Sequence, residues 1–193
     1  MGLSFHYSGS FRRNASLSDM IEEVKDISEI NKWHYSIFKK EFLPDAFGRN
    51  TFSNDVYGIT FSPPECEPVW LCFLSNGKLC SPVNLQLFGR SEDNKERKFL
   101  HMLSTKTQYA GIQAHIQIID LLKYLKEKYF EDLQVSDEGK YWETGDEKIL
   151  QAIFKRYNDA LDLVSDAVEN TSRMPHESFE DYFKRILKDK GNR

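Results

Sequence analysis

The sequence predicts an α+β fold with a mixed, largely antiparallel sheet, two helices from βαβ units and further helices at the C-terminus. Three observations predict this class. Segments with the alternation of strands and the 3.6-residue period of helices follow in the order strand, helix, strand at two separate places. Between these two places lies a run of short strands with turn residues. Amphipathic helical patterns end the chain.

The first place is a strand, a helix and a returning strand. Residues 3–7 alternate between apolar and polar side chains, as a half-buried strand does. Ser16 and Asp19 form a capping-box pattern at the start of a helix. Its apolar face is expected from residues at helical spacing, which are Leu17, Met20, Ile21, Val24, Ile27 and Ile30. The aromatic-rich stretch 33–38 fits the returning strand, and 44–55, with Pro, Gly and Asn residues, is expected as a loop.

The middle of the chain is predicted as antiparallel strands. Residues 56–61 fit a strand that two prolines stop. Residues 69–74 and a strand beginning at Leu79 are expected to form a hairpin. Asn76 and Gly77 supply the positive φ angles that a tight two-residue turn demands.

The second strand, helix and strand follow a charged stretch. Residues 83–88 and 99–107 are interpreted as strands, with a solvated loop at 90–98 between them. Gly111 is predicted to open a helix whose shared face is Ala114, Ile118, Leu121, Leu122, Leu125 and Tyr129. Residues 133–135 are the expected strand after it.

Two amphipathic helices are predicted to end the chain. Thr144 and Glu147 form a second capping box, followed by an apolar stripe of Leu150, Ile153, Phe154, Tyr157, Leu161, Val164 and Val168. A last helix is expected to begin near Pro175, because proline is favoured in the first turn. The chain is therefore divided into an α+β domain at 1–169 and a helical appendage at 170–193.

Composition excludes several classes of function. The formal net charge of −4 and the absence of a run of basic residues argue against nucleic-acid binding. The chain lacks both an apolar stretch of about 20 residues and a basic start followed by an apolar one, so neither membrane insertion nor secretion is expected. We therefore expect a cytoplasmic protein.

The cysteines predict neither a disulfide framework nor a metal site. Cys66, Cys72 and Cys80 are odd in number and contain no CxxC pair. Cys66 stands between two glutamates, which raise a thiol's pKa and make it an unlikely nucleophile. We expect no metal and no cofactor.

One group of polar residues is predicted at the ends of strands. In a βαβ unit with parallel strands, both strands end at the same edge of the sheet, where ligands commonly bind. This geometry gathers polar residues from two strand ends, and from the first strand if its unit is arranged likewise. These residues are His6, Tyr7, Lys106, Gln108, Asp137 and Glu138.

Two of the residues near this edge have competing interpretations. His115 lies in the first turn of the second helix, and with Asp137 and Glu138 it would suit either a metal or a general acid/base pair that divides proton transfer near neutral pH. A packed histidine with a single hydrogen bond is the favoured interpretation. Lys106 is expected either to form a salt bridge, for example with Asp137, or to hold an anion at the helix N-terminus.

The stretch DEGKYWETGD, residues 137–146, is unusually acidic and aromatic. Helix capping explains Thr144, Asp146 and Glu147. The aromatic pair, Tyr141 and Trp142, is expected either to form the wall of a pocket or to cover the core. The candidates that stay on this stretch are Asp137, Glu138, Trp142 and Glu143.

Three strings of the sequence resemble a family of bacterial proteins. They are MGLSFHYSG at 1–9, TKTQYAG at 105–111 and DEGKYWET at 137–144. The resemblance covers about the first 165 residues. It implies a bacterial cytoplasmic source and carries no implication about activity.

Two functions are consistent with these patterns. The first is a non-catalytic binding or regulatory domain, whose protein partner engages the acidic, aromatic edge at 137–143, by analogy with small acidic domains that neutralise a toxin. The alternative is a small-ligand-binding protein or hydrolase-like enzyme at the strand-end edge around Lys106, His115 and Asp137. No nucleophile elbow, phosphate loop or HExxH motif supports catalysis, so no catalytic residue is assigned.

Overall fold

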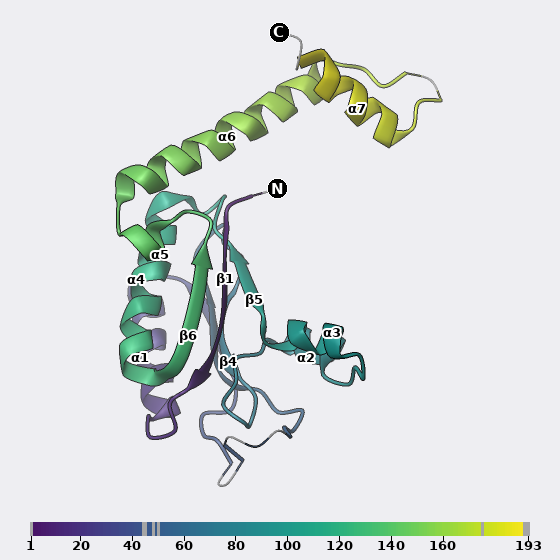
Figure 1. Ribbon diagram of the computed structural model, residues 1–193. Coiled ribbons are helices and arrows are strands. Elements are labelled where there is room, and N and C mark those ends of the chain that lie inside the picture. The colour runs from purple at the N-terminus through teal and green to yellow at the C-terminus, as the bar shows by residue number, and fades with distance from the viewer. Residues whose placement is uncertain (1, 44–45, 48, 50, 175, 191–193) are drawn as a thin grey trace. The chain divides into compact units, whose positions relative to one another are not determined.

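The computed structural model describes residues 2–43, 46–47, 49, 51–174 and 176–190 (Figure 1). It confirms the predicted α+β class, with two small antiparallel sheets and helices at the C-terminus. The chain divides into two compact units, Met1–Leu150 and Gln151–Arg193. Among the described residues, no helix combines the length and apolar character needed to cross a membrane.

The sheet that carries the strand-end edge has three strands in the order β5-β1-β6. They are β1 at Ser4–Phe11, β5 at Leu103–Lys106 and β6 at Phe130–Asp137. Both outer strands are antiparallel to β1, so β5 and β6 run parallel to each other. The helix α4, Gly111–Tyr129, connects them, which confirms the second predicted crossover and places β1 between its two strands.

The second sheet has the order β2-β3-β4. Its strands are β2 at His34–Ile37, β3 at Tyr57–Ser62 and β4 at Val69–Phe73. The helix α1, Leu17–Ile30, therefore links strands of different sheets, and the first predicted βαβ unit does not form. β5 and β6 pair with β1 on its two sides, and β2 pairs with β3 in the second sheet instead. Isolated bridges, Ser10 with Lys78 and Phe73 with Leu79, join the two sheets.

Both long helices of the first unit bury most of the faces that their sequences predict, but Ile30, predicted on the buried face of α1, is 79% exposed at the end of that helix. Ser16 caps α1 by accepting a hydrogen bond from the Asp19 N–H at 3.2 Å, and Met20, Ile21 and Val24 are fully buried. The buried side chains of α4 include Ile118, Ile119, Leu122 and Leu125. Figure 1 shows α1 and α4 on the same side of the strands, where these faces form the main core.

The hairpin turn lies where it is predicted but has a different form. Gly77 adopts φ +83°, whereas Asn76 has no positive φ. The Gly77 N–H donates to the Leu74 carbonyl at 2.9 Å, and the Leu74 N–H donates to the Lys78 carbonyl at 2.9 Å. This is a three-residue loop with one left-handed position, which is the next most common hairpin loop after the two-residue one.

The prediction of a strand at residues 83–88 is wrong. Pro82–Phe88 form α2, which Ser81 caps by accepting a hydrogen bond from the Asn84 N–H at 3.0 Å. Leu85 and Phe88 pack on a small core of Leu74, Cys80 and Leu100. Proline in the first turn and a serine before it are helix signals that outweigh a short apolar run.

The segment between α2 and β5 is also more helical than predicted. Asn94–Arg97 form the short helix α3 inside the expected loop. Lys98–His101 form the 3₁₀ helix η1, so the strand predicted at 99–107 is reduced to β5. The Asn84 amide donates to the Phe99 and Met102 carbonyls, each at 2.9 Å, and so holds α2 against this segment.

Three helices follow β6. They are α5 at Tyr141–Thr144, α6 at Glu147–Glu169 and α7 at Phe179–Lys190. Asp146 caps α6, because its carboxylate accepts hydrogen bonds from the N–H groups of Lys148 at 2.8 Å and Ile149 at 3.4 Å. The predicted cap, Thr144, instead donates to the Lys140 carbonyl at 2.6 Å.

The last helix begins after its predicted position. Pro175 lies outside the described residues, and Ser178 caps α7 by accepting from the Asp181 N–H at 3.1 Å. Within the second unit, Arg185 forms two 2.8 Å hydrogen bonds with the Glu177 carboxylate. The proposed division of domains at residue 169 stays a prediction.

Candidate functional site

The ends of β5 and β6 lie at one edge of the sheet, on either side of the start of β1. The register pairs Ser4 with Lys106 and Phe5 with both Thr105 and Asp137. Because side chains alternate between the two faces of a strand, Asp137 shares a face with Thr105, and Lys106 points to the opposite face. The possible Lys106–Asp137 salt bridge therefore does not form.

A chain of three polar side chains is buried on the helix side of this edge. His115 Nε2 lies 3.1 Å from Asp137 Oδ2, and His115 Nδ1 lies 2.8 Å from the Thr107 hydroxyl. All three side chains are fully buried, at 0% exposure. These three side chains connect the turn after β5, the first turn of α4 and the end of β6.

Among these three side chains, Asp137 accepts hydrogen bonds from several main-chain groups. Its Oδ1 accepts from the Gly139 N–H at 2.7 Å, and its Oδ2 accepts from Tyr141 at 2.8 Å and Trp142 at 3.0 Å. Burial by itself raises the pKa of Asp137, but the hydrogen bond and charge of His115 and these N–H groups outweigh it. The pKa therefore lies below its ordinary value, and the carboxylate is ionised at neutral pH.

The Thr107 hydroxyl can satisfy His115 in either protonation state. With Asp137 ionised, Nε2 donates to the carboxylate, and Nδ1 of a neutral ring accepts from the Thr107 hydroxyl. In a charged ring Nδ1 donates instead, and the hydroxyl can turn to the Leu3 carbonyl at 3.5 Å. The network thus avoids an unsatisfied buried group, which would cost about 1–3 kcal/mol.

Position 139 has little room for a side chain beside this network. A Cβ there would lie 2.6 Å from Leu150 Cδ1 and 3.0 Å from His115 Nε2. The next residue, Lys140, has a left-handed φ of 61°, which turns the chain from β6 into α5. Asp137 therefore serves as the anchor of a tight strand-to-helix turn.

Two predicted candidates hold the start of β1 in place. Gln108 Oε1 accepts from the Leu3 N–H at 2.9 Å, and Glu138 Oε2 accepts from the Ser4 N–H at 2.8 Å. The second oxygen of Glu138 lies 3.9 Å from His6 Nε2, and both of these side chains are partly exposed. Gln108 is buried, so its role in the fold is sufficient to explain it.

The remaining predicted candidates are dispersed around the edge. Tyr7 is buried, its hydroxyl accepts from the Trp70 N–H at 2.8 Å, and burial raises its pKa. The Lys106 N–H donates to the Glu67 carboxylate at 2.9 Å. Glu143 is exposed and accepts from the Asp137 N–H at 3.5 Å, and Trp142 is partly exposed. Lys126 Nζ lies 5.4 Å from the centroid of the Trp142 ring.

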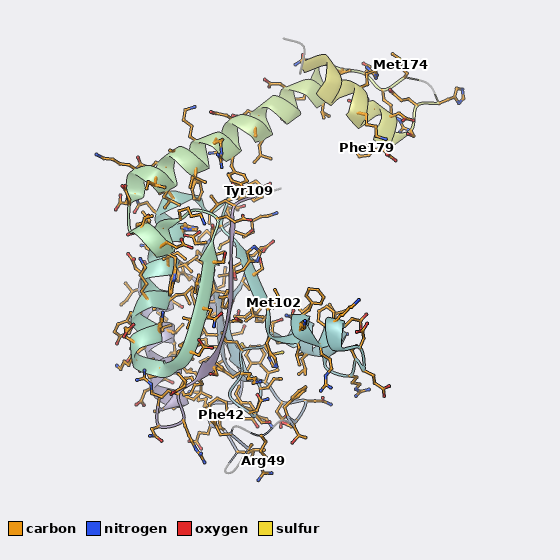
Figure 2. The ribbon with its side chains drawn as sticks, viewed as in Figure 1. Phe42, Arg49, Met102, Tyr109, Met174 and Phe179 are labelled. Carbon is orange, nitrogen blue, oxygen red and sulfur yellow. The ribbon has the colours of Figure 1, made fainter. Side chains whose placement is uncertain are left out.

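A separate depression lies on the face of the sheet opposite α4. Its volume is about 450 Å³, and its polar lining comes from His6, Ser8, Ser104, Gln134 and Ser136. Phe99 and Met102 line it on the side of η1, and Figure 2 labels Met102 near the start of β5. His6 is thus the predicted candidate that is both exposed and part of a depression.

Thr107, the third of these buried side chains, is not among the site residues that the sequence predicts. The available signal was its alternation with Thr105, which places both threonines on the face of Asp137 once the strands are paired. No cluster of three or more potential metal ligands occurs among the described side chains. Burial, together with Glu67, raises the pKa of the Cys66 thiol to about 12, so it is a poor nucleophile.

Comparison with known proteins gives no match: no family model, no curated protein and no solved structure is similar to this chain.

Proposed function

We propose that this chain is a non-catalytic, cytoplasmic protein-binding domain of bacterial origin, and that its partner engages the acidic edge formed by β6 and α5. The observation that carries the proposal is the distribution of charge. The segment 130–143 has five carboxylates and one lysine, a formal charge of −4, which equals that of the whole chain. The rest of the chain is therefore neutral overall.

Most of this charge is available to a partner. Glu131, Asp132, Glu138 and Glu143 are exposed, whereas Asp137 is buried in its network. Tyr141 is also buried, at 8% exposure, so the edge offers little apolar area. An acidic surface of this kind gives specificity and a fast association rate through electrostatic complementarity, and it favours a basic partner.

The proposal is tested by neutralising the exposed acids. The triple variant Glu131→Gln, Asp132→Asn, Glu138→Gln is immobilised, and partner capture from an extract of the source cells is quantified against the unaltered chain. We expect at least a tenfold loss of the captured protein, and release of that protein from the unaltered chain as salt rises.

A matched control separates local from overall charge. The triple variant Asp26→Asn, Glu41→Gln, Glu92→Gln removes three other exposed acids and should retain capture. Equal loss in both variants, or capture that neither variant changes, would contradict a role for the β6–α5 edge.

The alternative function is a small-ligand-binding or hydrolase-like site around Lys106, His115 and Asp137. It is supported by the hydroxyl, imidazole and carboxylate of Thr107, His115 and Asp137, which follow one another at hydrogen-bond distance as in a hydrolytic triad. Against it, all three are at 0% exposure, and Lys106 points to the other face. A substrate atom has to come within about 3 Å of a nucleophile, which this burial prevents.

This alternative also has a direct test. A thermal-shift screen against divalent metals and metabolite classes would detect a ligand, because a ligand at 100 times its Kd stabilises by about 2.7 kcal/mol. A shift that Lys106→Ala abolishes would support the alternative. We expect no such shift.

A further inference from the structure

The outer edge of β6 carries main-chain groups that β1 does not use. The Glu138 N–H donates to the Ser4 carbonyl at 3.1 Å, which fixes the alternation of the ladder between the two strands. In an antiparallel pair, hydrogen-bonded positions alternate along each strand. Leu133 and Val135 therefore direct their N–H and C=O groups away from β1.

Asp137, the next residue after Val135 in the same alternation, also directs its main-chain groups away from β1. The Asp137 N–H points away from β1 and donates to Glu143 at 3.5 Å, and the Asp137 carbonyl accepts from the Lys140 N–H at 3.1 Å. The turn into α5 thus satisfies the end of the edge. Among the described residues, no strand pairs with β6 besides β1, so the groups of Leu133 and Val135 stay open to a partner.

Charge along this edge is arranged in two blocks. Glu131 and Asp132 are exposed before the open groups, and Glu138 and Glu143 are exposed after them. The stretch between, residues 133–136, carries no charge and no proline. Edge strands usually carry charges or proline that prevent pairing, and here those devices are confined to the two ends.

We propose that β6 accepts an added strand from an extended, basic segment of a partner protein. This inference rests on the proposed function and names the chemistry and geometry of the partner. Main-chain hydrogen bonds to Leu133 and Val135 supply the pairing, and Lys or Arg side chains of the added strand meet the two acidic blocks. The partner is thus selected by charge and by an extended conformation.

The charge pattern argues against a second copy of this chain as the added strand. Antiparallel pairing of two copies about Val135 would place Asp132 of one copy opposite Glu138 of the other. Parallel pairing would place each acid next to its counterpart. Like charges at opposed positions destabilise a pair of strands. The same acids repel nucleic acid.

The experiment uses the full chain and a defined probe, the heptapeptide Lys-Val-Lys-Val-Lys-Val-Lys. Its binding is followed by NMR titration and by hydrogen exchange of individual amides. We expect the Leu133 and Val135 amides to exchange at least tenfold more slowly at saturating peptide. A peptide of the same charge that is N-methylated at every residue should bind at least tenfold more weakly, because it has no main-chain N–H to donate on either edge.

A pair of variants at one position isolates the main-chain contribution. Val135→Pro removes the outward N–H without removing a hydrogen bond to β1, and Val135→Ala retains that N–H. We expect at least a tenfold loss of peptide affinity in the first and less than a threefold loss in the second. If Val135→Pro fails to fold, the N-methylated peptide and the exchange data decide.

Several outcomes would overturn strand addition. Equal binding of the two peptides, no binding at millimolar concentration, or protection at His6 and Ser8 instead of Leu133 and Val135 would each do so. Capture of the natural partner that is lost in the acid-neutralised triple variant but retained in Val135→Pro would also overturn it. That last result would leave the proposed protein-binding function standing.

Discussion

His115 Nε2 and Asp137 Oδ2 lie 3.1 Å apart with neither side chain exposed, and this contact joins the first turn of α4 to the end of β6. Asp137 also accepts hydrogen bonds from three main-chain N–H groups of the turn into α5. The pair therefore holds α4, the end of β6 and the turn into α5 together, and we expect it to contribute to the stability of the fold.

Asp137→Asn is expected to destabilise the fold by about 3 kcal/mol, because an amide has one acceptor oxygen instead of two for the buried groups that donate to the carboxylate. Urea unfolding at pH 7 measures the loss. Glu131→Gln, which alters an exposed acid on the same strand, should change stability by less than about 0.5 kcal/mol. Equal stability of Asp137→Asn and the unaltered chain would show that the network contributes little.

The lowered pKa of Asp137 predicts a pH dependence of stability. A carboxyl whose pKa is lower in the folded than in the unfolded chain contributes stability above its unfolded pKa, about 3.9, and that contribution is lost as pH falls through the folded pKa. The stability difference between the unaltered chain and Asp137→Asn should thus shrink as pH falls below about 4. Unfolding series from pH 7 to pH 2.5 would reveal it, and a constant difference would contradict it.

The hydroxyl group of Thr107 is expected to stabilise the fold. Thr107→Val keeps the shape of the side chain but leaves His115 Nδ1 without its 2.8 Å partner, at a cost of about 1–3 kcal/mol. Thr107→Ser keeps the hydroxyl and loses a methyl group, at about 1 kcal/mol. Combining each with Asp137→Asn in a double-mutant cycle checks the assignment, because coupling should be seen with the valine and not with the serine.

The sequence predicts the strand-end edge but not the directions of its side chains. The crossover from β5 through α4 to β6 requires parallel strands, so the sequence places Lys106 and Asp137 at the same edge. Their opposite faces depend on the register of each strand with β1. Register describes how two strands pair, so it cannot be read from the alternation of side chains along one strand.

The same limit explains the errors of secondary structure. Residues 83–88 form a short apolar run, and its period fits a strand as well as one face of α2. Ser81 and Pro82 favour the helix locally, and a contact distant in sequence adds to them, because the Asn84 amide donates to the Phe99 and Met102 carbonyls. By contrast α1 was predicted with its cap, because Ser16 and Asp19 interact within one turn.

Two glycines with almost equal φ angles allow the cost of a left-handed backbone to be measured separately from the cost of a steric clash. Gly77 has φ +83° and a Cβ there would lie 2.5 Å from the Phe47 ring, whereas Gly111 has φ +84° and no atom within 4 Å. Gly111→Ala should cost about 1–2 kcal/mol from the left-handed backbone alone. Gly77→Ala should cost more, because the ring also has to move. Thermal unfolding of both variants measures the difference, and equal costs would show that Phe47 yields freely.

The start of α6 provides a test of which residue caps it. Asp146 accepts hydrogen bonds from the Lys148 and Ile149 N–H groups, while Thr144 donates to a carbonyl of the preceding turn. Asp146→Ala should therefore destabilise the start of the helix by about 1 kcal/mol and accelerate amide exchange at Lys148 and Ile149. Thr144→Ala should leave exchange at these two amides nearly unchanged, since its hydroxyl accepts only from the Asp146 N–H. Faster exchange in Thr144→Ala than in Asp146→Ala would restore the threonine as the cap that the sequence pattern predicts.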